Sequence, residues 1–118
     1  MNSVKDDLII NEFIHSLENK FPDILEGIIL YGSRARGDFR DYSDYDFLII
    51  YKDSGNKDML QDAVLDAEVL VMDKYNRLAS SLIWSHSDWE RKKKYPLGLN
   101  IQKEGKSLWT KKNILSPV

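Results

Sequence analysis

The sequence has no cysteine among its 118 residues. Disulfide bonds, thiolate zinc sites and cysteine nucleophiles are therefore excluded, and any metal ligands must come from oxygen atoms or from the two histidines. Long apolar runs are also missing, since no stretch approaches the roughly 18 residues of a membrane span. The charged N-terminal segment is not followed by the apolar core of a signal peptide. We expect a cytoplasmic protein that does not associate with membranes.

Neither sign of charge dominates the composition. Seventeen basic and nineteen acidic residues leave a net charge of -2, so no global field attracts the chain to nucleic acid. The basic residues 91–94, beside Trp89, could contact RNA or an acidic partner, but a solvated face is the simpler interpretation. Linkers, repeats and low-complexity tracts are absent. We therefore expect one domain over residues 1–118, with no separate lobe to bind a second substrate.

The first element predicted along the chain is an amphipathic helix over residues 4–21. Its apolar residues recur at steps of three and four from Ile10 to Phe21, which is the pattern of a helix with one buried face. Ser3 with Asp6 indicates an N-cap.

Several short apolar runs follow this helix. They alternate with turn signals and one helical pattern in the order strand, crossover, strand, helix, strand. This order predicts an α/β (α+β) domain with one mixed sheet flanked by helices. The expected strands are residues 24–31, 45–51 and 67–72, and the expected helices after the first are residues 56–65, 75–82 and 96–103.

The most informative segment begins where the first strand ends, at Gly32 and Ser33. Glycine permits a close approach of the backbone to a ligand. Ser33 stands where a short helix would begin, so free N–H groups and a hydroxyl can hold phosphate oxygens. Arg34 and Arg36 add positive charge nearby. These four residues are the predicted nucleotide-binding group.

Asp44 and Asp46 mark the start of the second strand. Residues two apart on a strand project from the same face, so the two carboxylates can converge on a cation. Magnesium prefers oxygen ligands and is commonly completed by substrate phosphates, and two such ions can assist nucleotidyl transfer. Taken alone, Gly32 and Ser33 could be a simple turn. Asp44 and Asp46, taken alone, could merely flank the start of a strand. Their combination at this spacing favours a magnesium and nucleotide site.

Residues 30–37, LYGSRARG, and residues 43–49, SDYDFLI, resemble the G-S-x10-D-x-D motif of the polymerase-β-like nucleotidyltransferases. More narrowly, the chain resembles the minimal nucleotidyltransferase (MNT) group, whose members in many bacteria and archaea are antitoxin partners of HEPN ribonuclease toxins. The resemblance implies a polymerase-β-like palm, ATP as nucleotide donor, and two magnesium ions held by Asp44 and Asp46. It also implies transfer of AMP to a tyrosine of the toxin.

The family usually carries a third carboxylate on the next core strand, and Glu68 is the aligned residue in the expected strand 67–72. Glu68 is therefore the third candidate for metal binding and catalysis. Asp66 lies on the same face of the expected strand and is a possible substitute. Asp73 would point to the opposite face and is a weaker candidate.

Three hypotheses follow from this site. The first is an enzyme that modifies a HEPN-type toxin, and the second is an antitoxin that acts by binding, with weak or absent catalysis. The third is nucleotidyl transfer to a small molecule. Because the chain has no lobe of its own to present an acceptor, a partner protein or a second copy of the chain would have to do so.

Overall fold

A four-stranded mixed sheet is the centre of the fold in the computed structural model, which describes residues 4–111, with side chains from residue 8 onward. The strand order is β3-β2-β1-β4. β1 pairs antiparallel with β2 and with β4, whereas β2 and β3 are parallel because α3 connects them as a crossover. The strands are β1 (Leu25–Tyr31), β2 (Tyr45–Tyr51), β3 (Ala79–Ser85) and β4 (Lys106–Thr110).

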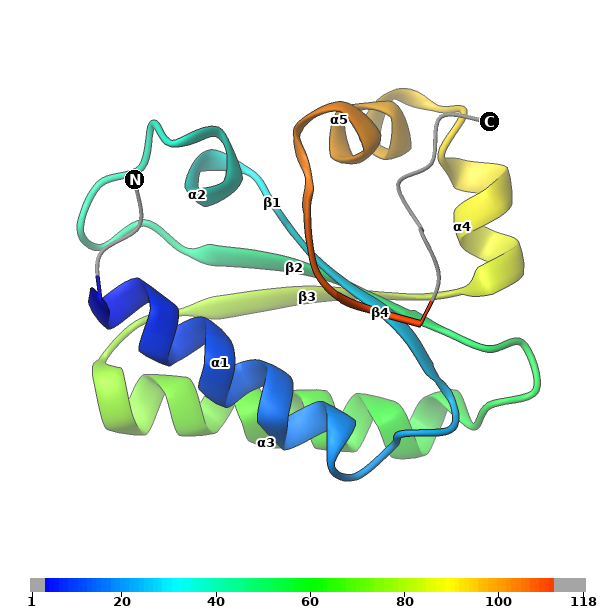
Figure 1. Ribbon diagram of the computed structural model, residues 1–118, viewed down its shortest axis with the longest axis horizontal. Helices are drawn as coiled ribbons and strands as arrows, with labels where there is room; N and C mark the ends of the chain where they lie inside the picture. Colours follow the sequence, from blue (N-terminus) through cyan, green and yellow to red (C-terminus); the bar gives the residue numbers. More distant parts are fainter. Residues whose placement is uncertain (1–3, 112–118) are drawn as a thin grey trace.

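Helices cover both faces of the sheet. Figure 1 shows α1 and α3 side by side on one face, and α2, α4 and α5 on the other. No helix among residues 4–111 is both long enough and apolar enough to span a bilayer. The helices are α1 (Val4–Glu18), α2 (Ser33–Arg36), α3 (Lys57–Tyr75), α4 (His86–Lys92) and α5 (Pro96–Glu104).

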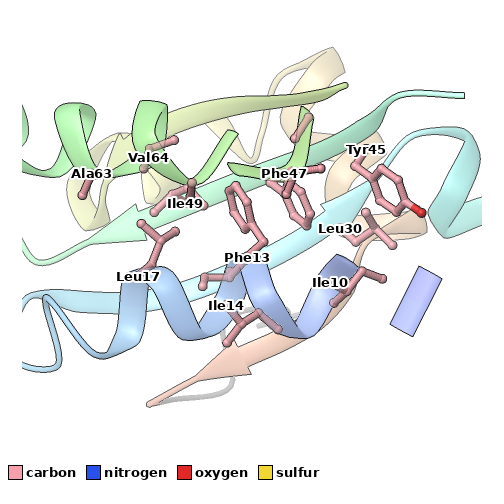
Figure 2. Close-up of a cluster of buried hydrophobic side chains, with 14 of the residues drawn as sticks. Ile10, Phe13, Ile14, Leu17, Leu30, Tyr45, Phe47, Ile49, Ala63 and Val64 are labelled. Carbon is pink, nitrogen blue, oxygen red and sulfur yellow. The ribbon is translucent and has the colours of Figure 1, made fainter. Parts of the chain in front are cut away.

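The larger hydrophobic core lies between the sheet and the α1/α3 layer (Figure 2). Phe13 of α1 stacks on Phe47 of β2 with ring centroids 4.0 Å apart, and both side chains are fully buried. Alternation along β2 sends Tyr45, Phe47 and Ile49 to this face. Asp46 must then project from the opposite face.

The opposite face carries a smaller core. Trp84 of β3 packs against the fully buried Trp89 of α4, with ring centroids 6.2 Å apart. Leu48, Ile50 and Ile101 complete the same cluster. This core ends before Asp46, which leaves the end of the sheet where β2 begins free for a site.

The predicted mixed α/β sheet is confirmed. The structure contains the first helix, which ends at Glu18, and the strands predicted at residues 24–31 and 45–51. The helix predicted at residues 96–103 is α5. The expected cap residue Ser3 lies outside the described residues.

The prediction between residues 56 and 82 is wrong. The expected helix 56–65 and strand 67–72 form the single helix α3, and the third strand lies at β3, where a helix was expected. Buried α3 residues such as Ala63, Ala67 and Val71 recur at steps of four and form one helical stripe. Asn56 caps the helix start, and Asn76 ends it in the left-handed conformation.

Phe13→Ala tests the larger core. We expect a loss of about 3–5 kcal/mol in the free energy of unfolding, the usual cost of emptying a buried phenylalanine site. Urea denaturation followed by circular dichroism measures it. Leu8→Ala on the same helix, at a side chain that is 54% exposed, should change the free energy by less than about 0.5 kcal/mol. Equal effects of the two substitutions would contradict the assigned face of α1.

Candidate active site

The antiparallel pairing of β1 and β2 brings together the two halves of the sequence motif. Tyr31, the last residue of β1, is paired with Asp46 of β2. Gly32 directly follows β1, and Asp44 directly precedes β2. The predicted turn and the predicted carboxylates therefore meet at one end of the same strand pair.

Gly32 approaches Asp46 so closely that no side chain fits between them. Its backbone has φ 75° and ψ −158°, a conformation that glycine adopts far more readily than other residues. A Cβ atom at this position would collide with the Asp46 Oδ2 and would lie 3.3 Å from its Cγ. α2 starts at the next residue, Ser33. The glycine is thus required both by its φ angle and by the neighbouring carboxylate.

The electrostatics of the aspartate pair suit a cation. Burial raises the pKa of Asp46, and the nearby Asp44 raises it further, while Arg36 acts in the opposite direction. Two neighbouring carboxylates supply the hard oxygen donors that a divalent ion prefers. Among the described residues, however, no three histidine, aspartate or glutamate side chains gather as a metal-binding group. The pair thus fits a cation whose remaining ligands come from substrate or water.

Arg36 lies beside this pair and is held by two acidic side chains. Its guanidinium contacts Asp38 at 3.3 Å and Glu104 at 3.2 Å, and these contacts raise its pKa. Arg36 also lowers the pKa of Asp46. Its exposed side chain can exchange these partners for a phosphate, as the sequence predicts.

Two neighbours of the site were missed by the sequence analysis. Tyr31 has its pKa raised by burial and then by the charge of Asp46. Glu104 comes from the end of α5 and reaches the site because Lys106, at the start of β4, pairs with Leu30 of β1. No local pattern signals a contact between residues so distant in the sequence. Strand pairing alone creates it.

Arg34 has an environment different from the expected one. Its side chain is buried, with 3% exposure, and it donates hydrogen bonds to backbone carbonyls of the segment between α2 and β2. The guanidinium is therefore engaged by the protein itself.

Glu68 does not lie on a strand, so its expected place as a third carboxylate on the sheet is wrong. It belongs to α3 and lines a hollow with Ser81 and Ile83 of β3. Ser81 is one residue beyond Ser80, the partner of Asp46, and so points to the opposite face of the sheet. Burial raises the pKa of Glu68.

Asp66, the possible substitute for Glu68, and Asp73, which was less favoured, are on the same helix. Asp66 and Asp73 are exposed residues of α3. β3, the strand that does lie beside β2, contains no acidic residue. The third strand is therefore Ala79–Ser85 and not the expected segment 67–72.

Comparison with known proteins shows which family the chain belongs to. Residues 4–112 match the sequence profile of the family described as nucleotidyltransferase domain. A protein of Methanocaldococcus jannaschii named "Putative protein adenylyltransferase MJ0604" is 32% identical over 100 residues, which cover 85% of this chain and 94% of that protein.

Solved structures share the fold at low sequence identity. A chain from the complex of tri-AMPylated Shewanella oneidensis HEPN toxin with MNT antitoxin superposes with a TM-score of 0.53 at 18% identity, covering 88% of this chain and 71% of that one. Spectinomycin adenyltransferase AAD(9) from Enterococcus faecialis, with ATP and spectinomycin, gives a TM-score of 0.60 at 18% identity, covering 92% and 57%. With a profile match over nearly its whole length and a turn that abuts a carboxylate pair, the chain belongs to the nucleotidyltransferase domain family.

Proposed function

We propose that this nucleotidyltransferase moves AMP from ATP to a tyrosine hydroxyl of a HEPN-type toxin, in the cytoplasm, and thereby silences the toxin. The observation that carries the proposal is the close approach of the Gly32 backbone to the Asp46 carboxylate, which leaves no room for a Cβ atom at residue 32. It joins a phosphate-binding turn to a cation-binding pair at one point, which is what transfer from a triphosphate requires.

Each residue of the site has a separate task. Gly32 and Ser33 hold the triphosphate through backbone N–H groups and the serine hydroxyl, and Arg36 neutralises part of its charge. Asp44 and Asp46 would hold magnesium, two ions in the full complex. When bound, the metal supplies charge neutralisation at the phosphates and lowers the pKa of a coordinated hydroxyl.

The reaction is a substitution at the α-phosphorus of ATP. The acceptor oxygen forms a bond to that phosphorus, and the bond to the bridging oxygen of the β-phosphate breaks. Pyrophosphate departs with the electron pair, and the acceptor proton is released to solvent. The turn at Gly32 and Ser33 orients the triphosphate for this displacement, so its contribution is positioning and electrostatics.

The names of similar proteins support a protein acceptor. The Methanocaldococcus jannaschii relative is named as a protein adenylyltransferase, and one structural neighbour comes from a complex of a tri-AMPylated HEPN toxin with an MNT antitoxin. We place a partner protein, or a second copy of the chain, over the open end of the sheet, where Asp44 is exposed.

A second function, inhibition by binding alone, is favoured by one observation. β3 contains no carboxylate opposite Asp46. An enzyme of this type that lacked a third metal ligand would catalyse slowly, yet its surface could still occupy a toxin. Catalysis and inhibition must therefore be measured separately.

The direct test is transfer from ATP labelled on its α-phosphate to a HEPN-type toxin, with magnesium present. We expect wild-type protein to label the toxin and Asp46→Asn to reduce the rate by at least about 100-fold, because several kcal/mol of transition-state stabilisation are lost. Glu68→Gln is the matched control, since Glu68 lies on the other face of the sheet, and should keep the wild-type rate.

The outcomes separate the two functions. Loss of label together with loss of toxin inhibition in Asp46→Asn supports the enzyme. Inhibition that survives without labelling supports binding alone. Equal damage from Glu68→Gln would contradict the site described above.

Gly32→Ala tests the contact between the turn and the carboxylate. We expect it to weaken binding of a non-hydrolysable ATP analogue, because the added Cβ displaces Asp46. Gly37→Ala is the control: Gly37 also has a positive φ, 91°, but a Cβ there meets nothing within 4 Å. Alanine in the left-handed conformation of Gly37 costs about 1–2 kcal/mol, whereas the Gly32 conformation, with ψ −158°, is adopted almost only by glycine and adds a strain of about 1–3 kcal/mol. Calorimetric titration showing equal binding by the two variants would count against the site.

The melting temperature should report the charge on Asp46. Without a divalent cation at neutral pH, we expect Asp46→Asn to melt above wild type, because the substitution removes a charge disfavoured by burial and by Asp44. The difference should shrink as the pH falls through the raised pKa of Asp46, where wild type becomes neutral too. Magnesium should stabilise only wild type. Scanning calorimetry would reject the idea if magnesium stabilised both proteins equally.

A further inference from the structure

Arg34 is a buried cation in the middle of the site motif. Its guanidinium carbon lies 4.1 Å from the ring centroid of Tyr45 and 4.5 Å from that of Phe39. The side chain is 3% exposed. A planar, delocalised cation can stack on aromatic rings in this way, which the compact ammonium of lysine does less well.

The same guanidinium donates hydrogen bonds to three backbone carbonyls of the segment that follows α2. Its Nη2 lies 3.3 Å from the Arg40 carbonyl oxygen, 2.9 Å from that of Asp41 and 2.9 Å from that of Ser43. Its Nε lies 3.1 Å from the Ser43 carbonyl oxygen. The Nε and Nη2 donors of Arg34 therefore point into the backbone of residues 40–43, and the side chain is buried.

The segment that Arg34 holds has little packing of its own. Most side chains of residues 38–44 are exposed. A short turn ties Ser43 to Arg40, whose N–H donates to the Ser43 hydroxyl at 2.8 Å. This turn gives the segment a local shape, but it does not attach the segment to α2. The buried contacts of Arg34 do, because Arg34 is a residue of α2, and the exposed pair of Arg36 with Asp38 adds a second link.

Residues 38–44 connect the turn at Gly32 to the aspartate pair. Asp44 is the last residue of the segment, and the carbonyl of its neighbour Ser43 accepts two of the Arg34 bonds. We infer that Arg34 is a positioning residue for nucleotidyl transfer: it fixes residues 38–44 against α2 and so holds Asp44 and Asp46 in register with the turn. The inference rests on the function proposed above for these aspartates.

The experiment compares Arg34→Lys and Arg34→Ala with Arg40→Ala, which removes an exposed arginine of the same segment. Two readouts are used on the full chain: hydrogen exchange of residues 38–44, and steady-state labelling of a HEPN-type toxin from ATP. We expect faster exchange in this segment for both Arg34 variants, with unchanged exchange in β1 and β2. Arg40→Ala should match wild type.

In the kinetic readout, we expect kcat to fall by about 100-fold, the cost of a displacement of about 1 Å at a reacting centre. The KM for ATP should change much less, because Arg34 does not touch the nucleotide. Added guanidinium ion should restore part of the kcat of Arg34→Ala by filling the space between the two rings. Methylammonium, which lacks the planar group, should not.

A rise in the KM for ATP at constant kcat would overturn the inference, because it would indicate that Arg34 binds the phosphates of ATP. A lower melting temperature with normal kcat and normal exchange in residues 38–44 would also overturn it. If Arg34→Ala fails to fold, Arg34→Lys gives the same comparison. If wild type transfers no label, the proposed function fails, while the exchange data and Mn²⁺ binding with a non-hydrolysable ATP analogue still decide the role of Arg34.

Discussion

The antiparallel register of β1 and β2 is the constraint on which the rest of the site depends. It places Tyr31 opposite Asp46, so the turn that follows β1 emerges against a carboxylate. A slip of one residue would move Asp46 to the α1/α3 face of the sheet and would take the Phe47 ring away from Phe13. The core therefore penalises the wrong register strongly. Packing on the α1/α3 face therefore determines that Asp46 projects from the opposite face, where the site lies.

The two faces of the sheet have different roles. The α1/α3 face is filled along the length of β2 by large apolar side chains. The other face has a smaller core around Trp84 and Trp89, and it leaves the beginning of β2 to Asp46. α5 and β4 return the chain to this end, where Glu104 meets Arg36. The C-terminal part thus contributes to the site through one ion pair and one strand pairing.

Two features of the site are energetically unfavourable, and the rest of the structure must compensate for them. Asp46 is partly buried next to Asp44, which disfavours its charge, and Gly32 has a positive φ angle. Such local conflicts are typical of functional sites held in place by a well-packed scaffold. Arg36 offsets part of this conflict, because its charge lowers the pKa of Asp46.

The sequence by itself determined the first helix, the strands that contain residues 25–31 and 45–51, and the meeting of a glycine turn with two aspartates, because each has a local period or spacing. It did not distinguish helix from strand around Glu68, since Ala67 and Val71 fit both periods and only packing against α1 and β3 selects the helix. Only the tertiary structure decided which charged residues share the site. In the structure Glu68 lies on the other face of the sheet, Glu104 contacts Arg36, and the Arg34 side chain is buried. These placements could not be predicted, because side-chain direction and long-range strand pairing leave no signal in the local sequence.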